Sequence, residues 1–257
     1  MSAKPKAKII RHGGFFDAKD TRLFYNECVE KEEFKIVIIQ GPPGSGKGTQ
    51  SKILADRFGF YHFTTSQVIK EFMRNRDDPE TLKQKENYDN GLLMDPPWVL
   101  NVVKEKTLEI LEENGGKKGI IYDGSPRTLY EAENLFDFLE KLVGKKNIKV
   151  IKLEVSEEEL KRRLEKRLIC GNSGDHVFIR SDDLEPGSPC PEGDGVLSKR
   201  DLDKKELFPT RISEYKNRTI PGLEFLKARV GVIAVNGEQS IENVQREIIK
   251  KVFNDND

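Results

Sequence analysis

The chain has 257 residues, which is enough for one sizeable hydrophobic core with inserted lobes. Its 44 basic side chains balance its 44 acidic ones, so no overall charge points to a nucleic acid or a membrane surface as partner. Three cysteines are too few for a disulfide framework, and no stretch is long and apolar enough to span a membrane. These features predict a soluble protein of the reducing cytoplasm.

Residues 1–33 precede the first predicted strand. The basic N-terminus lacks the apolar segment of a signal peptide, so we expect no export signal. A short helix is predicted over residues 17–32, with Leu23, Phe24 and Val29 facing inward. We interpret the whole segment as an N-terminal extension, a tail that packs on the core or stays disordered.

Residues 34–50, FKIVIIQGPPGSGKGTQ, contain the most informative pattern of the chain. The β-branched residues within 36–40 predict a buried strand, which ends at a glycine-rich turn. Residues 46–58 carry apolar side chains at helical spacing. A strand, a glycine-rich loop and a helix in this order are typical of a phosphate-binding loop.

The residues of this loop have the properties that phosphate binding requires. Gly44 and Gly46 lack a Cβ atom, so backbone N–H groups can approach phosphate oxygens at the positive end of the helix. Lys47 supplies a positive charge for the β- and γ-phosphates. Gly48 follows the lysine where the general motif has Ser or Thr, and a hydroxyl comes only at Thr49. An ordinary glycine-rich turn before a helix is the alternative interpretation.

Beyond the loop, predicted strands and helices alternate along the chain. Strands are expected over residues 59–63, 119–123, 148–155 and 230–235. Helices are expected over residues 65–73, 80–88, 98–113, 127–142, 158–167, 204–227 and 240–252. Ser156 is expected to cap the helix that follows it. The alternation predicts an α/β fold, a three-layer sandwich in which helices cover both faces of a five-stranded parallel sheet.

Two stretches do not fit this sheet, namely residues 65–94 and the glycine- and proline-rich residues 168–203. Both are inserted on the side of the C-terminal strand ends, where ligands bind in such sheets. Two inserts that face one phosphate loop suggest two clamps that close on two substrates. The segments 34–64, 95–167 and 204–257 then form the expected core domain.

The third predicted strand ends at Asp123, and Gly124 and Arg127 follow it. The carboxylate of Asp123 lies where it could hold the water shell of a Mg²⁺ ion. Arg127 is placed to contact a phosphate with both donors of its fork. A helix-capping or turn role is the alternative for Asp123.

The GPPGSGKGTQ sequence, with glycine after the lysine, resembles that of the adenylate kinase family of nucleoside monophosphate kinases, which are P-loop NTPases. The family's D-G-[FY]-P-R signature appears at residues 123–127, with Ser125 in place of the aromatic residue. The family's lid motif, L-x-x-R-x-x-x-R followed by R-x-x-D and R-x-x-x-Y, is matched by Arg163, Arg167, Arg200, Asp203, Arg211 and Tyr215. The resemblance covers residues 35–253.

The resemblance implies an activity, which is direct Mg²⁺-dependent transfer of the γ-phosphate of ATP to AMP, giving two ADP. The enzyme would act as a monomer, with residues 65–94 as the insert that binds the nucleoside monophosphate. Residues 168–203 would be the lid, whose closure excludes water. Arg163 and Arg167, four residues apart in a predicted helix, would share one face, with Arg163 covering the donor base.

The resemblance also implies three sets of site residues. The expected ATP-binding residues are Gly44, Ser45, Gly46, Lys47, Gly48, Thr49, Arg163 and Arg167. The expected acceptor-binding residues are Thr65, Lys70, Leu92, Met94, Gly124, Arg127, Glu131, Arg200 and Arg211. The expected catalytic residues are Lys47, Arg127, Arg167, Arg200 and Arg211, and Asp203 would fix the lid arginines.

The acceptor side departs most from the family pattern. Its T-G-D-[LM]-[LF]-R motif ends here in Lys70, which would meet a phosphate as a point charge instead of a fork. The family's base-reading glutamine falls at Glu131, whose carboxylate accepts hydrogen bonds but donates none. AMP is the expected acceptor on family grounds. GMP or a pyrimidine nucleoside monophosphate is the alternative, since a carboxylate suits the two donors on one edge of guanine.

Two further alternatives follow from the same departures. Glu131 could be an exposed helix residue with no part in base recognition. The protein could also be a non-catalytic nucleotide-binding homologue, because Ser66, Gln67 and Lys70 all differ from the family motif. Retention of the full cationic set argues against a protein that only binds.

Cys170 and Cys190 lie at the spacing of the family's lid cluster, C-x₂-C-x₁₆-C-x₂-[CD], whose other two places hold a serine and a glycine here. Two thiolates alone do not make a structural zinc site, which requires four ligands. His176 or Asp194 could complete the set with a shifted register. We favour a metal-free lid over a zinc site. Phe178 could stack where the family has another ring.

Overall fold

The computed structural model describes residues 34–74, 76–113, 117–171, 176–181, 183–193 and 195–253. The predicted N-terminal extension, with its helix, lies outside the described residues. Among the residues described, no helix combines the length and the apolar character that a membrane crossing requires.

The order of elements matches the predicted alternation. The strands are β1 (Lys35–Gln40), β2 (Tyr61–Thr64), β3 (Gly119–Asp123), β4 (Ile148–Glu154), β5 (Arg167–Cys170), β6 (Val177–Ile179), β7 (Leu197–Ser198) and β8 (Ile233–Asn236). The α-helices are α2 (Lys47–Phe58), α3 (Thr65–Met73), α4 (Pro79–Asp89), α5 (Pro96–Glu113), α6 (Leu129–Val143), α7 (Glu157–Lys166), α8 (Phe208–Glu214), α9 (Ile220–Val230) and α10 (Ile241–Val252). Short 3₁₀ turns lie at Lys145–Asn147, Asp201–Asp203 and Lys205–Leu207, and a π-helical segment at Tyr215–Thr219.

Within the described residues, five strands form one parallel sheet in the order β2-β3-β1-β4-β8, which confirms the predicted sheet. The register pairs Ile39 of β1 with Asp123 of β3, and Thr64 of β2 with the same Asp123. The C-terminal ends of these three strands therefore lie together at one edge of the sheet. The loops that follow them carry the residues of the expected site.

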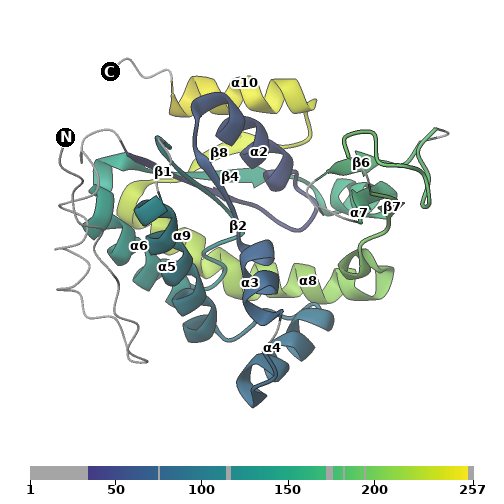
Figure 1. The fold of residues 1–257 in the computed structure, drawn as a ribbon. Coiled ribbons are helices and arrows are strands. Elements are labelled where there is room, and N and C mark those ends of the chain that lie inside the picture. Colours follow the sequence, from purple (N-terminus) through teal and green to yellow (C-terminus); the bar gives the residue numbers. More distant parts are fainter. Residues whose placement is uncertain are drawn as a thin grey trace, which may run out of the picture.

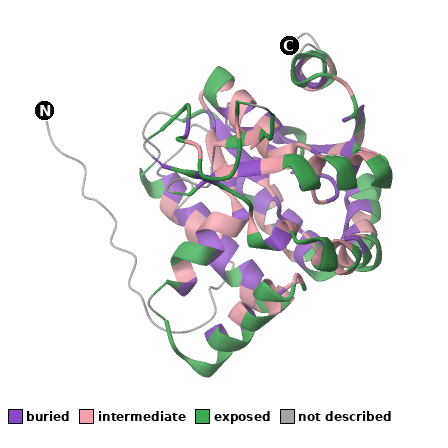
Figure 2. Ribbon diagram, turned by 90° about the vertical axis from the view of Figure 1, so that its right-hand side faces the viewer, coloured by how far each residue is buried: buried purple, intermediate pink, exposed green. Residues whose placement is uncertain are grey.

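Helices cover both faces of this sheet, so the three-layer α/β fold is confirmed (Figure 1). Helices α2 and α10 lie on one face, and their apolar side chains pack with those of the sheet around Ile39 and Leu54. Helices α5, α6 and α9 lie on the other face, where a larger cluster includes Tyr122 and Phe136. Figure 2 shows buried residues on the strands and on the inward sides of the helices.

The two predicted inserts have structures of their own. Residues 65–94 form the helices α3 and α4, which lie below the sheet in Figure 1. The second insert contains a small antiparallel sheet in the order β6-β5-β7. Leu168, Leu197 and the two cysteines form its apolar core, and Phe178 packs against them. Phe178 thus contributes to the apolar packing of the lid.

The predicted helix over residues 158–167 is wrong at its C-terminal end. Helix α7 ends at Lys166, and Arg167 has the extended dihedral angles φ −69° and ψ 132°. Arg167 instead begins β5, where it is the antiparallel partner of Ile179. Arg163 and Arg167 therefore do not share a helix face. Ser156 occupies the predicted N-cap position, but its side chain makes no capping hydrogen bond.

The helix predicted over residues 204–227 is present but starts later and is irregular, because the backbone is helical without a break from residue 208 to residue 230. The segment consists of a 3₁₀ turn, α8, the π-helical segment and α9. Pro209 and Pro221 stand in the first turns of α8 and α9. Because proline has no N–H to donate and clashes with the preceding turn, that turn is π-helical, and the chain then continues through Pro221 as α9. The last strand, predicted over residues 230–235, begins only at Ile233 because α9 continues to Val230.

Candidate active site

The loop between β1 and α2 has the form that its sequence predicts. Gly46 occupies the N-cap of α2 with φ 91°, a left-handed conformation that favours glycine. Lys47 opens the helix, and its Nζ donates a hydrogen bond to the carbonyl oxygen of Pro42 at 3.3 Å. Burial lowers the pKa of Lys47 to about 7, Asp123 opposes this effect, and nearby arginines add to it. The loop thus places a partly buried amine beside the carbonyl oxygen of Pro42.

The structure gives a steric reason for glycine at position 48, which the sequence alone does not provide. A Cβ atom at this position would lie 3.1 Å from the carboxylate Oδ2 of Asp123. The glycine therefore allows the carboxylate at the end of β3 to pack directly against the start of α2. Lys47 lowers the pKa of Asp123 through its charge, which shows that the two side chains are electrostatically coupled.

Asp123 is a buried carboxylate that remains ionised. Burial raises its pKa, but the nearby His62 and the charges of Lys47 and Arg127 outweigh burial, and the pKa falls below its ordinary value. The Nε2 atom of His62 lies 3.8 Å from Oδ2 of Asp123. An ionised oxygen ligand at a phosphate loop fits the preference of Mg²⁺, which binds through a few carboxylates together with phosphates and water.

Asp203 joins two of the arginines that the lid motif predicts. Its carboxylate accepts hydrogen bonds from Nε and Nη2 of Arg167 at 2.7 and 2.5 Å, and from Nη1 of Arg211 at 3.0 Å. The Asp203 side chain is only 4% exposed. Burial lowers the pKa of Arg211 to about 10, although Asp203 acts in the opposite direction. One carboxylate for two partly buried guanidinium groups leaves an excess of positive charge, which suits an anionic ligand.

These cations face the phosphate loop. Arg127, Arg211 and Arg167 each lower the pKa of Lys47 through their charges. The structure therefore brings together residues from the phosphate loop, from the end of β3, from β5 and from α8. Arg200 lies on the same side, since its charge affects both Arg127 and Arg211.

Arg163 lies beside the phosphate loop, although it comes from α7. Its Nη1 donates to the carbonyl oxygen of Ser45 at 3.5 Å, and its Nη2 donates to that of Gly237 at 2.8 Å. Glu159 accepts a bond from its Nε at 2.7 Å. The guanidinium group thus links the loop to the turn after β8, on the side where a donor nucleotide would enter.

The segment after β3 holds the expected acceptor-binding residues in a dense hydrogen-bond network. Arg127 donates from Nε to the carbonyl oxygen of Gly124 at 2.7 Å. Ser125, which replaces the family's aromatic residue, is buried and accepts a hydrogen bond from the hydroxyl of Thr65 at 3.0 Å. The serine thus links the loop after β3 to the first residue of α3.

Glu131 is 3% exposed, so the interpretation of an exposed helix residue is wrong. Its carboxylate accepts hydrogen bonds from the backbone N–H of Arg127 at 2.9 Å and from the hydroxyl of Thr128 at 3.0 Å. Thr128 in turn accepts the N–H of Glu131, so the pair caps the start of α6. Burial raises the pKa of Glu131, and the bonds from Arg127 and Thr128 oppose that rise.

The end of the first insert is attached to the core by two residues that the sequence did not reveal. The N–H of Leu93 donates to Oε2 of Glu214 at 2.8 Å. Nη1 of Arg218 donates to the carbonyl oxygen of Leu93 at 3.2 Å and to Oε2 of Glu214 at 3.0 Å. Of the two neighbours expected to bind the acceptor, Leu92 is 41% exposed and Met94 is buried.

Other side chains near the site also escaped the sequence analysis, namely His62 and Tyr88. His62 could have been found, because it lies two residues before Thr64 on the strand next to β3 and thus on the same edge as Asp123. Tyr88, Glu214 and Arg218 carry no such signal, since only the tertiary fold brings them to the site.

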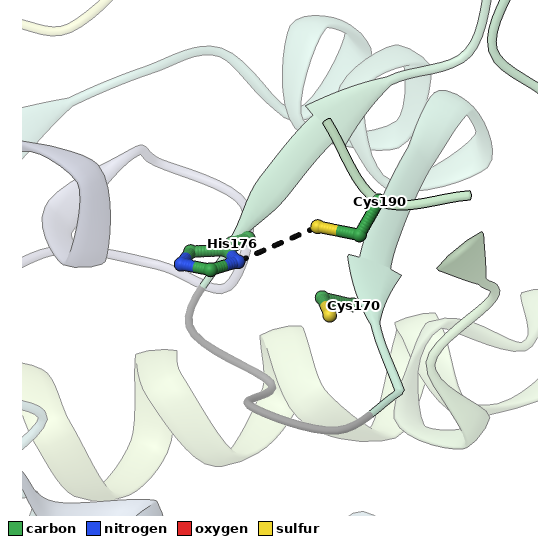
Figure 3. A group of neighbouring side chains, drawn as sticks. All are labelled: Cys170, His176 and Cys190. Atoms are coloured by element: carbon green, nitrogen blue, oxygen red, sulfur yellow. Dashed lines mark hydrogen bonds between the residues drawn. The ribbon is translucent and has the colours of Figure 1, made fainter. Parts of the chain in front are cut away.

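A group of metal-ligating atoms lies in the lid (Figure 3). The side chains of Cys170, His176 and Cys190 point toward one another, and their ligand atoms lie within 4.8 Å of one another. The distance between Nδ1 of His176 and Sγ of Cys190 is 3.4 Å. These separations suit tetrahedral zinc, whose bonds to sulfur and nitrogen are about 2.3 and 2.1 Å long. The structure thus brings His176 into the group, while Asp194 lies outside the described residues.

Comparison with known proteins agrees with the geometry. The family model described as adenylate kinase matches residues 39–230. The chain is 34% identical over 216 residues to an adenylate kinase of Caldicellulosiruptor bescii, covering 83% of this chain and 97% of that protein. It is 34% identical over 218 residues to one of Chlamydia pneumoniae, covering 85% and 97% of the two chains. Together with the phosphate loop and the arginine cluster, these matches show that the chain belongs to the adenylate kinase family.

Proposed function

We propose that this chain catalyses ATP + AMP ⇌ 2 ADP by direct transfer of a phosphoryl group. The observation that carries the proposal is the cluster of Arg167, Arg211 and Lys47 around one end of the sheet, with a single buried Asp203 to position the arginines. Phosphoryl transfer between two nucleotides brings several negative charges together, so it requires cations that are in place beforehand.

The roles of the site residues follow from their positions. Lys47 and the N–H groups from Gly44 to Thr49 bind the β- and γ-phosphates of ATP. Arg167 contacts the phosphoryl group in transfer, and Arg127, Arg200 and Arg211 bind the acceptor phosphate. No general base is required, because the acceptor phosphate is already ionised at neutral pH. The arrangement therefore acts by positioning and by charge.

Mg²⁺ enters the site with ATP. Asp123 would hold it, directly or through water, and the ion would neutralise charge that builds up on the phosphates. The ionised state of Asp123 supports this assignment. In the lid, Cys170, His176 and Cys190 would supply three of the four ligands of a structural zinc ion, so we propose zinc in place of the metal-free lid that the sequence favoured.

The two inserts exclude water from the reaction. Residues 65–94 bind the nucleoside monophosphate and residues 168–203 close over ATP, while the segments 34–64, 95–167 and 204–257 form the core. Closure prevents hydrolysis of the activated phosphate, which competes with transfer. One chain supplies both inserts and every residue named above, so we propose a monomer.

GMP remains an alternative acceptor substrate because of Glu131. A buried carboxylate at the base-reading position suits the two N–H donors on one edge of guanine better than the adenine edge. The acceptor is identified by measuring nucleoside diphosphate formation from ATP and Mg²⁺, with AMP, GMP, CMP and UMP tested separately. Turnover with AMP supports the proposal, and exclusive turnover with GMP replaces it. Tight ATP binding without any turnover identifies a non-catalytic homologue.

A further inference from the structure

Tyr88 lies among the cations that the acceptor phosphate would meet. It belongs to the last turn of α4, in the insert over residues 65–94. Its hydroxyl oxygen accepts a hydrogen bond from Nη2 of Arg200 at 3.2 Å. Nζ of Lys70 lies 5.6 Å from the centre of its ring. The phenol is thus placed between a cation of α3 and a cation from the end of the lid.

A third cation belongs to the same group. The charges of Arg200 and Tyr88 both affect the pKa of Arg127, so Arg127 lies within electrostatic range of the phenol. Lys70, Arg127 and Arg200 come from three separate segments of the chain. Tyr88 lies near each of these three cations.

The phenol proton is available to a ligand. The hydrogen bond found for the Tyr88 hydroxyl among the described residues is one that its oxygen accepts, from Arg200. Burial opposes ionisation of the phenol, but the nearby Arg200 and Lys70 outweigh burial and lower its pKa. An O–H group that is polarised in this way is a strong donor to an anionic oxygen.

We propose that Tyr88 is an acceptor-binding residue whose hydroxyl donates a hydrogen bond to the phosphate of the nucleoside monophosphate. The proposal rests on the proposed function, because it requires that phosphate to lie among Lys70, Arg127 and Arg200. It also gives a reason for the lysine at position 70. A lysine offers a point charge where an arginine offers a fork, and the hydroxyl of Tyr88 supplies the second directed donor.

A purely structural role for Tyr88 makes different predictions. The bond to Arg200 joins the first insert to the end of the lid, so the phenol could act only as a latch between the two lobes. Loss of a latch would change kcat or the KM values of both substrates. Loss of a phosphate ligand changes the binding of the acceptor alone.

The test is Tyr88→Phe, which keeps the ring and its packing against the large apolar cluster but removes the hydroxyl. We expect the KM for the acceptor to rise by about tenfold or more, the usual effect of losing a hydrogen bond to a charged group. The KM for ATP and kcat at saturating acceptor should stay within about twofold of wild type. Tyr61→Phe is the matched control, because Tyr61 packs against the same cluster and lies at the opposite end of β2 from the site.

A second measurement separates the phosphate from the rest of the nucleotide. Adenosine, which lacks the phosphate, is measured as a competitive inhibitor against AMP in both proteins. The proposal requires that Tyr88→Phe leave its inhibition constant unchanged. An equal loss of AMP and adenosine binding, an unchanged KM for AMP, or parallel changes for ATP would overturn it. The wild-type acceptor panel tests the proposed function separately, and the variant is compared with wild type on whichever acceptor the wild type uses.

Discussion

Arg167 and Asp203 form a bidentate ion pair, although they lie 36 residues apart in the sequence: Nε of Arg167 is 2.7 Å from Oδ2 of Asp203, and Nη2 is 2.5 Å from Oδ1. The pair joins the first residue of β5 to the 3₁₀ turn at the end of the lid. Arg211 from α8 uses the same carboxylate. Asp203 therefore sets the positions of two arginines that would otherwise repel each other.

The first prediction concerns this carboxylate. Asp203→Asn keeps the shape of the side chain but removes the charge, so Arg167 and Arg211 lose their common counter-ion. We expect kcat to fall by about 10- to 100-fold, as when a preorganised transition-state contact is lost. Breaking a buried pair should also reduce the free energy of unfolding by about 3 kcal/mol. The measurements are a coupled assay of ADP formation and urea unfolding.

The neighbouring acid provides the control for that variant. Asp201 lies in the same 3₁₀ turn, but its side chain is 93% exposed and pairs only with Lys204 among the described residues. Asp201→Asn should leave both kcat and stability unchanged, since exposed ion pairs contribute little. Equal effects of the two substitutions would show that the carboxylate of Asp203 does not position the arginines.

The second prediction is that ATP binding takes up a proton through Lys47. Burial lowers the pKa of this lysine to about 7 in the free protein. Phosphates favour its charged form, so at pH 8 a mostly neutral amine must be protonated when ATP binds. Calorimetry in buffers of different ionisation enthalpy should detect uptake of up to about one proton at pH 8 and much less at pH 6.

Lys47→Ala should remove this proton uptake and abolish transfer while the fold is kept. The same lysine affects stability with a definite sign. Its folded pKa lies below the ordinary value, so the unfolded chain binds more protons between pH 7 and 10.5. The contribution of Lys47 to the free energy of unfolding therefore rises with pH between pH 7 and 10.5. Lys83→Ala, an exposed change in α4, is the control, and near-normal turnover of Lys47→Ala would contradict the phosphate-loop assignment.

Much of the fold could be predicted because local patterns and the sheet agree. The β-branched run before the glycine loop and the alternation that follows it predict the parallel sheet. The errors lie where tertiary contacts override local propensity. Arg167 has the sequence of a helix end, but pairing with Ile179 draws it into β5. Pro221 follows a π-helical stretch within a long helix whose apolar spacing alone predicts a regular α-helix.

The site residues that belong to a motif with fixed spacing could be predicted from the sequence. Spacing within the lid motif identified Arg167, Asp203 and Arg211, which the structure brings into contact. Tyr88 and Arg218 were not predictable, because a lone tyrosine or arginine on a helix is most often a surface or packing residue. Only the folded chain places them beside Lys70 and Leu93.

The third prediction concerns recognition of the acceptor base. Glu131→Gln introduces an N–H donor at a position that is buried beside Arg127. If the side chain reads the base, glutamine can donate to N1 of adenine, and kcat/KM for AMP should rise by about tenfold. Use of GMP should fall in the same variant. Values that stay constant for every acceptor would limit Glu131 to capping α6 with Thr128.

The fourth prediction is that the lid binds zinc through Cys170, His176 and Cys190. The three ligand atoms already lie within 4.8 Å of one another, so little rearrangement is needed for coordination. We expect about one zinc ion per chain by elemental analysis, and a chelator should lower the melting temperature by several degrees, since bound metal stabilises the folded state alone. Cys190→Ser should abolish both effects, whereas Cys28→Ser, the third cysteine of the sequence, should not. If the chain contains no zinc and the chelator does not change its melting temperature, the lid is metal-free and is stabilised by the hydrogen bond between His176 and Cys190.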